Sequence, residues 1–232
     1  PVTRGVNMRE MISASRFEIV GGMYVQPEVA EPHGECLIRQ ILYGKRWFMD
    51  KLGVDVRCAW NIDTFGQCTQ LPQILAKSGY RYMVFSRGMP PRIAKEMPSE
   101  FIYESPDGSR ILTHWMAGHY CGGQDNINGL LSTVCEHRTT DVIMIPWGCD
   151  ITVPAKDSGV IESIVRKAAI DLGVDVDWVG TSTPSRFFED LLSFRPKHKV
   201  ITMDFNPPLL GGDLRGTYDN RIELKKLNRE VE

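Results

Sequence analysis

Short apolar runs alternate with amphipathic segments along most of the chain. Apolar positions spaced three or four apart are typical of helices, whereas short continuous apolar runs are typical of buried strands. The pattern predicts helices over residues 36–52, 70–78, 127–137, 157–172, 184–192 and 223–232. It predicts strands over residues 58–62, 82–85, 110–116, 142–145, 178–179 and 199–205. Strands that alternate with helices indicate βαβ units, and therefore an α/β fold with a mostly parallel sheet covered on both faces.

Two segments rich in proline and glycine interrupt this alternation. Residues 86–109 and 205–217 are both predicted to be long surface loops, and the second contains one Pro-Pro pair and one Gly-Gly pair. Long loops in compact domains commonly carry function, so both are candidate regions for a binding site.

Composition narrows the classes of partner. The chain has 232 residues, 42% of them hydrophobic, and a formal net charge of −2. A nucleic-acid-binding domain is usually basic, so we expect no nucleic-acid partner. No apolar run approaches the roughly 18 residues that a membrane span requires, and the start of the chain shows no signal-peptide pattern. We therefore expect no membrane association.

The six cysteines do not form a recognisable metal or redox motif. None stands in a C-x-x-C spacing, and the sequence has no N-x-[ST] glycosylation site. In a chain of this size we expect reduced, partly buried thiols rather than disulfides, and a cytoplasmic location.

Three polar side chains each follow a predicted strand: Asp63, Arg87 and Asp150. In parallel α/β folds, reactive residues gather at the carboxyl ends of the strands. If the three strands are neighbours, two carboxylates and one guanidinium open onto the same face. Paired carboxylates are the groups that glycoside hydrolysis requires.

Aromatic side chains stand beside these polar residues, namely Trp60, Phe65 and Trp147. Together with the carboxylates they suggest a sugar site, in which aromatic faces cover the apolar faces of a sugar. Each residue also has an ordinary interpretation. An aspartate after a strand is often a helix cap, an arginine is often a surface charge, and aromatic residues are usually core. Only the combination favours function.

The histidines give little support to a zinc site made by this chain alone. None of them falls in an H-x-H, H-x-D or H-E-x-x-H spacing; they are His33, His114, His119, His137 and His198.

Several separated motifs, in order, make the sequence resemble glycoside hydrolase family 38, the α-mannosidases, over nearly its whole length. The strongest is A-W-N-I-D-T-F-G, where family members carry W-x-x-D-x-F-G. The segments that carry the resemblance are 16–28, 34–40, 44–47, 59–66, 146–150, 216–221, and Lys225, Asn228, Arg229 and Glu232.

The resemblance implies a retaining glycosidase that removes terminal α-linked mannose. Asp63 matches the aspartate that is both nucleophile and zinc ligand, and Asp150 matches the general acid/base. Phe65 and Arg87 match residues of the mannose subsite, and Tyr218 is expected near the substrate. The implied fold is a distorted (β/α) barrel of about seven strands, or an open, mostly parallel sheet.

The resemblance also implies one zinc ion in the complete family site. Of the four expected ligands only Asp63 is found here, so zinc is expected to bind this chain alone weakly or not at all. Cys149 stands in place of an acidic residue next to Asp150. Residues 1–232 are interpreted as part of an N-terminal catalytic domain, without the first zinc-ligand strand and the C-terminal helical and β domains.

The expected partner is a mannose-containing oligosaccharide or glycoside, and the chain could also form a homo-oligomer or need complementing segments. Two other functions stay open. One is a metal-dependent carbohydrate deacetylase. The other is a non-catalytic or split carbohydrate-binding fragment of the same fold.

Overall fold

The computed structural model describes residues 7–205 and 221–231. The chain divides into two compact units. The sheet unit consists of Ile19–His114 and His198–Glu232, and the helical unit consists of Pro1–Glu18 and Trp115–Lys197. Tyr218 and nearly all of the predicted loop 205–217 lie outside the described residues.

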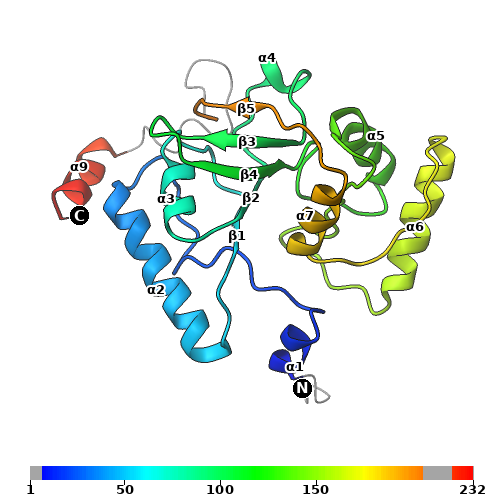
Figure 1. Cartoon of the computed structure of the whole chain (residues 1–232), viewed down its shortest axis with the longest axis horizontal. Coiled ribbons are helices and arrows are strands. Elements are labelled where there is room, and N and C mark those ends of the chain that lie inside the picture. The colour runs from blue at the N-terminus through cyan, green and yellow to red at the C-terminus, as the bar shows by residue number, and fades with distance from the viewer. Residues whose placement is uncertain (1–6, 206–220, 232) are drawn as a thin grey trace. The chain divides into compact units, whose positions relative to one another are not determined.

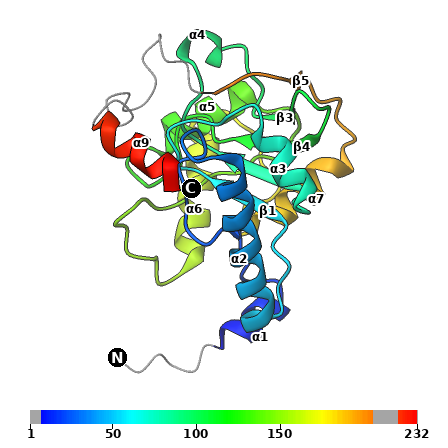
Figure 2. The ribbon, with the colours of Figure 1, turned by 90° about the vertical axis from the view of Figure 1, so that its left-hand side faces the viewer.

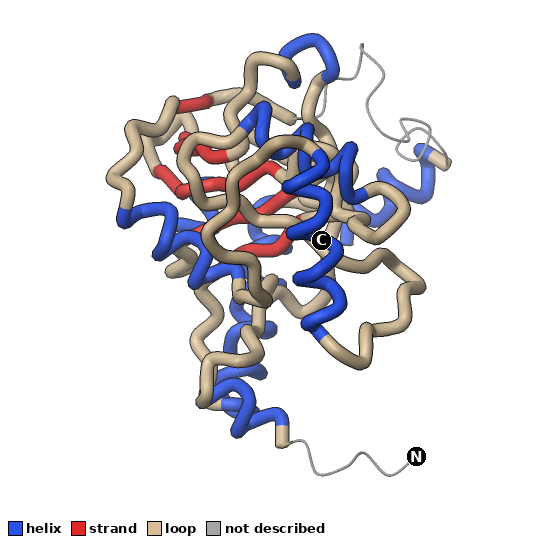
Figure 3. The backbone as a smooth tube through the Cα atoms, turned by 90° about the vertical axis from the view of Figure 1, so that its right-hand side faces the viewer, coloured by secondary structure: helices blue, strands red, loops and turns tan. Residues whose placement is uncertain are grey.

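Five strands form one sheet, in the order β1-β2-β4-β3-β5 (labelled in Figure 1). Figure 3 draws the strands of this sheet in red. They are β1 (Cys58–Asn61), β2 (Tyr82–Phe85), β3 (Glu100–Glu104), β4 (Arg110–Trp115) and β5 (Val200–Ile201). β1 pairs with β2 and β3 pairs with β5 in parallel, whereas β3 and β4 are antiparallel. The predicted α/β class with a mostly parallel sheet is confirmed.

The helices of the sheet unit are α2 (Gly34–Leu52), α3 (Leu71–Lys77), α4 (Pro91–Ala94) and α9 (Ile222–Val231). α2 and α3 lie side by side on the same side of the sheet (Figures 1 and 2). α2 buries Leu37 and Ile41, four positions apart, as the sequence pattern requires. It ends at Gly53, which takes the left-handed conformation that glycine adopts without steric cost.

The prediction of a surface loop over residues 86–109 was wrong, because this segment contains α4 and β3. β3 is an interior strand of the sheet that buries Phe101 and Tyr103. Its first residue, Glu100, faces His114 of β4 at 2.8 Å, and both side chains are only 2% exposed. Charged residues at both ends of the strand concealed its burial in the sequence.

The helical unit contains α1 (Met8–Ser13), α5 (Ile127–His137), α6 (Ser158–Asp171) and α7 (Pro184–Ser193). The last three were predicted, and α1 was not. α5 and α6 pack together through a core formed by Ile127, Leu131, Val165, Ala168 and Ala169. None of the described helices combines the length and the apolar character that a membrane crossing requires.

Two predicted strands, 142–145 and 178–179, do not form. Ile143, Ile145 and Trp147 alternate along an extended segment and pack against the core of α5 and α6. These side chains are partly buried by helices, without a neighbouring strand. Val179 packs against the same core. Both segments thus pack partly on helices and lack the ladder of backbone hydrogen bonds that a strand has.

The predicted strand 199–205 is shortened to β5 (Val200–Ile201), but Phe205, the last residue of the predicted strand, lies in the core. Phe205 is fully buried and lies 5.1 Å from the ring of Phe85 and 5.1 Å from the ring of Tyr103. The Tyr103 hydroxyl donates to the carbonyl of Met203 at 2.9 Å, and burial raises the pKa of this hydroxyl, which keeps it protonated. The segment after β5 is thus fixed by aromatic packing.

We expect the substitution Gly44→Ala to destabilise the sheet unit. A Cβ at Gly44, in the middle of α2, would lie 2.3 Å from the carbonyl oxygen of Gly22 and 2.5 Å from the carbonyl carbon of Met23. Overpacking of this kind costs about 1–3 kcal/mol. The matched control is Gly34→Ala in the same helix, whose Cβ would meet only Ile74, at 3.9 Å. Urea unfolding followed by circular dichroism measures both, and equal midpoints would contradict the prediction.

Candidate functional site

The parallel pairing of β1 with β2 brings Asp63 and Arg87 together. Asn61 pairs with Phe85 in the register of the two strands. Asp63 and Arg87 each stand two residues further along, so the same register places them side by side. Arg87 Nε donates a hydrogen bond to Asp63 Oδ1 at 2.5 Å. The side chain of Arg87 is 21% exposed and that of Asp63 is 43% exposed, so this charged pair remains open to solvent.

Phe65 completes this group at the carboxyl ends of β1 and β2. The guanidinium of Arg87 lies 5.5 Å from the centre of the Phe65 ring, within the range of a cation–π interaction. An aromatic face beside a carboxylate and a guanidinium is a suitable surface for a sugar ring. Trp60, the fourth predicted residue here, lies in β1 and is half-buried.

A buried network of polar side chains shapes the turn that carries Asp63. Thr64 Oγ1 donates to the carbonyl of Asn61 at 3.1 Å, and Gln67 Nε2 donates to Thr64 Oγ1 at 2.6 Å. Asn61 Nδ2 donates to Gln67 Oε1 at 3.4 Å, which closes the ring of bonds. Asn61, Thr64 and Gln67 are all buried. Because these buried groups satisfy one another, the backbone on both sides of Asp63 is held in one conformation.

Glu28 anchors the same turn, and the sequence analysis did not identify it as a site residue. The backbone N–H of Phe65 donates to Glu28 Oε1 at 2.9 Å and Oε2 at 3.0 Å. A hydrogen bond to an ionised group is stronger than one between neutral groups. Glu28 stands 37 residues before Phe65, so no local spacing could have indicated this contact.

Gly88, next to Arg87, fits against the segment that follows β5. A Cβ at Gly88 would lie 2.1 Å from the carbonyl oxygen of Phe205, and the residue has a φ of +97°. Gln67 and Phe205 also exchange two backbone hydrogen bonds, of 2.9 and 3.2 Å. The turns after β1 and β2 are thus both fixed on the chain near Phe205.

Cys68 follows this turn but is a poor nucleophile. Burial raises the pKa of its thiol, so the group stays protonated at neutral pH. Cys68 is therefore not a candidate nucleophile of this site.

Asp150 lies in the helical unit, on the segment between α5 and α6. Its side chain is exposed, and its Oδ1 accepts a hydrogen bond from the hydroxyl of Tyr120 at 3.3 Å. The strand predicted before it does not form. The structure thus brings Asp63, Phe65 and Arg87 together within one unit, and the pairing of Asp63 with Asp150 stays a prediction.

The expectation of reduced thiols throughout was wrong for one pair. Cys121 and Cys149 form a disulfide, and Cys36, Cys58, Cys68 and Cys135 are not disulfide-bonded. The two bonded cysteines are 28 residues apart, and no spacing motif marks them. They meet because the backbones of Gly122 and Gly148 pair in an antiparallel bridge.

The zinc ion implied by the resemblance does not fit the described residues around Asp63. Over residues 7–205 and 221–231, one group of three histidine, cysteine or acidic side chains has ligand atoms close enough to share an ion, and Asp63 is not part of it. His33 caps the start of α2 by accepting from the N–H of Glu35, and His114 is buried against Glu100. A catalytic zinc site takes about three protein ligands, and the described residues do not bring three such side chains together around Asp63.

Residues 3–203 match the model of a protein family that is described as "Glycosyl hydrolases family 38 N-terminal domain". The chain belongs to glycosyl hydrolase family 38. It is 33% identical to "Alpha-mannosidase 2C1" of Homo sapiens over 97% of the chain and 21% of that protein. It is 26% identical to an "Alpha-mannosidase" of Saccharomyces cerevisiae over 94% of the chain and 21% of that protein. The chain thus spans about a fifth of the length of these relatives.

Solved structures support the fold. An α-mannosidase from Enterococcus faecalis V583 superposes with a TM-score of 0.70 at 19% identity, covering 86% of this chain and 23% of that one. A 4-α-glucanotransferase from Thermococcus litoralis gives a TM-score of 0.53 at 17% identity, covering 83% of this chain and 31% of that one. At these identities the likeness concerns the fold.

We expect Glu28→Ala to destabilise the sheet unit by about 1.5–3 kcal/mol, because it removes the charged acceptor of the Phe65 N–H. Glu28→Gln keeps a carbonyl oxygen as acceptor and should lose less. Glu96→Ala, an exposed glutamate of the same unit, is the matched control. Urea unfolding gives the three free energies. A Glu28→Ala variant as stable as the control would refute the role of Glu28.

Proposed function

We propose that this chain carries the catalytic centre of a retaining α-mannosidase, with Asp63 as nucleophile and Asp150 as general acid/base. The observation that carries the proposal is the hydrogen bond between Arg87 and Asp63 at the carboxyl ends of β1 and β2. Membership of family 38 and the α-mannosidase relatives support the substrate class.

Arg87 suits Asp63 for nucleophilic attack in two ways. The bond from Arg87 Nε to Oδ1 fixes the plane of the carboxylate, so Oδ2 is the oxygen that we assign to the attack. The positive guanidinium is also the counter-ion of the carboxylate, with which it forms an ion pair. Phe65 and Arg87 line the space in front of the carboxylate, where the mannose ring is proposed to lie; Trp60 and Tyr218 are further proposed contacts.

The reaction then has two steps. In the first, Asp63 forms a bond to the anomeric carbon while the bond to the leaving oxygen breaks, and the Asp150 carboxyl group gives that oxygen its proton. In the second, the Asp150 carboxylate takes a proton from water, the water oxygen bonds to the anomeric carbon, and Asp63 is released. Retention requires the two carboxyl groups to be roughly 5–6 Å apart. A separation well beyond ~10 Å in a crystal structure would contradict this pairing.

The proposal also includes the expectations about substrate, domain extent, zinc, location and self-association. The substrate is a mannose-containing oligosaccharide or glycoside, and residues 1–232 form part of an N-terminal catalytic domain. One zinc ion in the complete site, a cytoplasmic location and self-association or complementation stay predictions. A non-catalytic carbohydrate-binding fragment is the alternative function. The family match favours a glycosidase over a deacetylase.

Hydrolysis of a chromogenic α-mannoside, with and without added zinc, tests the proposal directly. Asp63→Asn should remove nearly all turnover without changing the circular-dichroism spectrum, because an amide cannot form the glycosyl–enzyme bond. The matched control is Asp175→Asn, an exposed aspartate of the helical unit. An Asp63→Asn variant that keeps its activity would exclude Asp63 as nucleophile. Mannoside binding without turnover in the unsubstituted chain would favour the non-catalytic alternative.

Asp150→Asn should lower turnover less for substrates with an activated leaving group than for ordinary mannosides. An activated leaving group departs without a proton, so the missing general acid matters little. The measurement is kcat/KM for the two substrate types in the Asp150→Asn variant and in the unsubstituted chain. Equal losses on both would count against Asp150 as the acid.

A further inference from the structure

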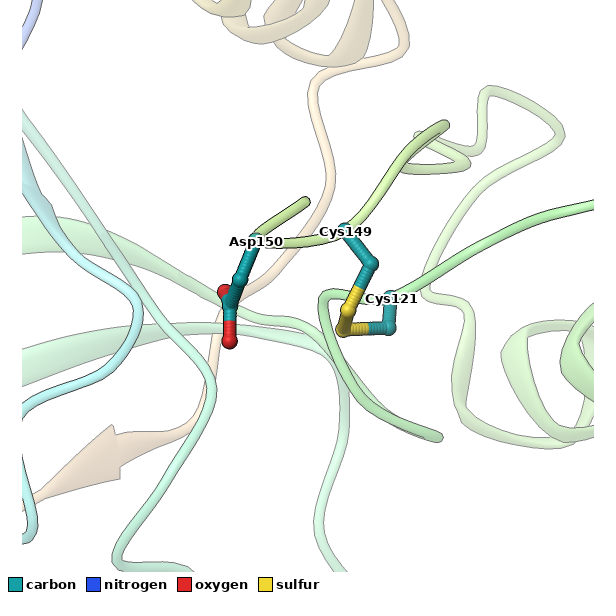
Figure 4. A group of neighbouring side chains, drawn as sticks. All are labelled: Cys121, Cys149 and Asp150. Carbon is teal, nitrogen blue, oxygen red and sulfur yellow. A yellow bond between two sulfur atoms is a disulfide. The ribbon is translucent and has the colours of Figure 1, made fainter. Parts of the chain in front are cut away.

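Three potential metal ligands meet within the helical unit. The ligand atoms of Cys121, Cys149 and Asp150 all lie within 4.8 Å of one another (Figure 4). Cys149 and Asp150 are consecutive, and Cys121 comes from the segment between β4 and α5. Cys149 and Asp150 are exposed and Cys121 is half-buried, so a small ion can reach the group from solvent.

The two cysteines are held together by their neighbours as well as by the disulfide. The backbones of Gly122 and Gly148 exchange hydrogen bonds of 3.1 and 2.8 Å. A Cβ at Gly122 would lie 1.9 Å from the carbonyl oxygen of Pro146, so the two segments touch at the backbone itself. Because this bridge does not involve sulfur, we expect the segments to stay together when the disulfide is reduced.

Each of the three residues also has its own local support. Asn126 Nδ2 donates to the carbonyl of Cys121 at 2.8 Å, and the N–H of Cys149 donates to Thr152 Oγ1 at 2.9 Å. The Tyr120 hydroxyl donates to Asp150 Oδ1 at 3.3 Å. Ligands that are positioned in advance lose little freedom on binding an ion, and this favours affinity.

We propose that the reduced form of this group binds a thiophilic divalent cation such as zinc, through both thiolates and the Asp150 carboxylate. A dithiol reductant supplies two electrons and two protons to the disulfide and is itself oxidised to a cyclic disulfide. Each thiol then gives its proton to solvent as the metal binds. Two thiolates and one carboxylate carry three negative charges against the two positive charges of the ion, and water takes the fourth position.

The geometry suits such an ion. Zn–S bonds of about 2.3 Å at tetrahedral angles place two sulfurs roughly 3.8 Å apart. The Cα atoms of Cys121 and Cys149 are 4.5 Å apart, so rotation of the side chains about Cα–Cβ can open this separation. Sulfurs bonded to each other are not thiolates, so the oxidised form lacks two of the three ligands. The site is therefore available only in the reduced chain. Its ligands do not include Asp63, the ligand implied for the family zinc, and the site does not depend on the proposed mannosidase activity.

Titration with cobalt(II) and then zinc tests the site without any activity measurement. The 232-residue chain is reduced with a dithiol, freed of reductant under anaerobic conditions and titrated. We expect one cobalt ion per chain with a sulfur-to-metal charge-transfer band, which zinc then removes because it binds such ligands more tightly than cobalt. The oxidised chain should show no band. Absence of the band in the folded, reduced chain would overturn the proposal.

Variants separate this site from the other thiols. The double variant Cys121→Ser/Cys149→Ser keeps the four cysteines that form no disulfide and should lose the band. Asp150→Asn should lower zinc affinity by at least about tenfold. Loss of a residue that only hydrogen-bonds a metal ligand already lowers metal affinity by about tenfold or more, and Asp150 is proposed to be a ligand itself. Cys135→Ser and Asp177→Asn, in the same unit, are the matched controls.

A band that survives in the double serine variant would assign the metal to other thiols and overturn the proposal. So would an Asp150→Asn variant with unchanged affinity. Circular dichroism checks folding at each step. A reduced chain that loses its helical signal and does not regain it with zinc would also contradict the proposal, because the Gly122–Gly148 bridge would then have failed to hold the site.

Discussion

The parallel pairing of β1 with β2 is the constraint on which the candidate site depends. Asn61 and Phe85 are partners in this register, so Asp63 and Arg87, each two residues beyond the end of its strand, meet and form an ion pair. A shift of the register by one residue would turn one of the two side chains away from the other. The chemistry of the sheet unit therefore follows directly from backbone hydrogen bonding between two four-residue strands.

Segments distant in the sequence keep this pair in place. Glu28 holds the N–H of Phe65, and the backbone of Phe205 holds Gln67 and fits against Gly88. The ring of Phe205 in turn belongs to the buried aromatic cluster of the sheet. Packing of Phe205 in the core thus fixes the position of the turn that carries Asp63. A functional site requires such support from rigid elements.

The helical unit holds its own candidate residue in a different manner. Asp150 lies on an extended segment whose apolar side chains pack on α5 and α6, without a strand partner. The Gly122–Gly148 bridge and the neighbouring disulfide fix this segment a few residues before Asp150. The position of Asp150 is therefore fixed by two glycines and two cysteines, whereas that of Asp63 is fixed by the register of two strands. Reduction of the disulfide changes the chemistry beside Asp150, because it releases two potential ligands next to the carboxylate.

The sequence by itself determined the local features. Apolar periodicity identified β1, β2, α2 and α6 because such patterns depend only on neighbouring residues, and residues that follow strands gave Asp63 and Arg87. Several separated motifs, in the right order, indicated the resemblance to glycoside hydrolase family 38. Only the tertiary structure decided that residues 100–104 are a buried strand, that 142–145 pack on helices, that Glu28 anchors Phe65 and that Cys121 meets Cys149. Each of these depends on which distant segment supplies a partner for a charge, a backbone group or an apolar face, and local sequence patterns do not contain that information.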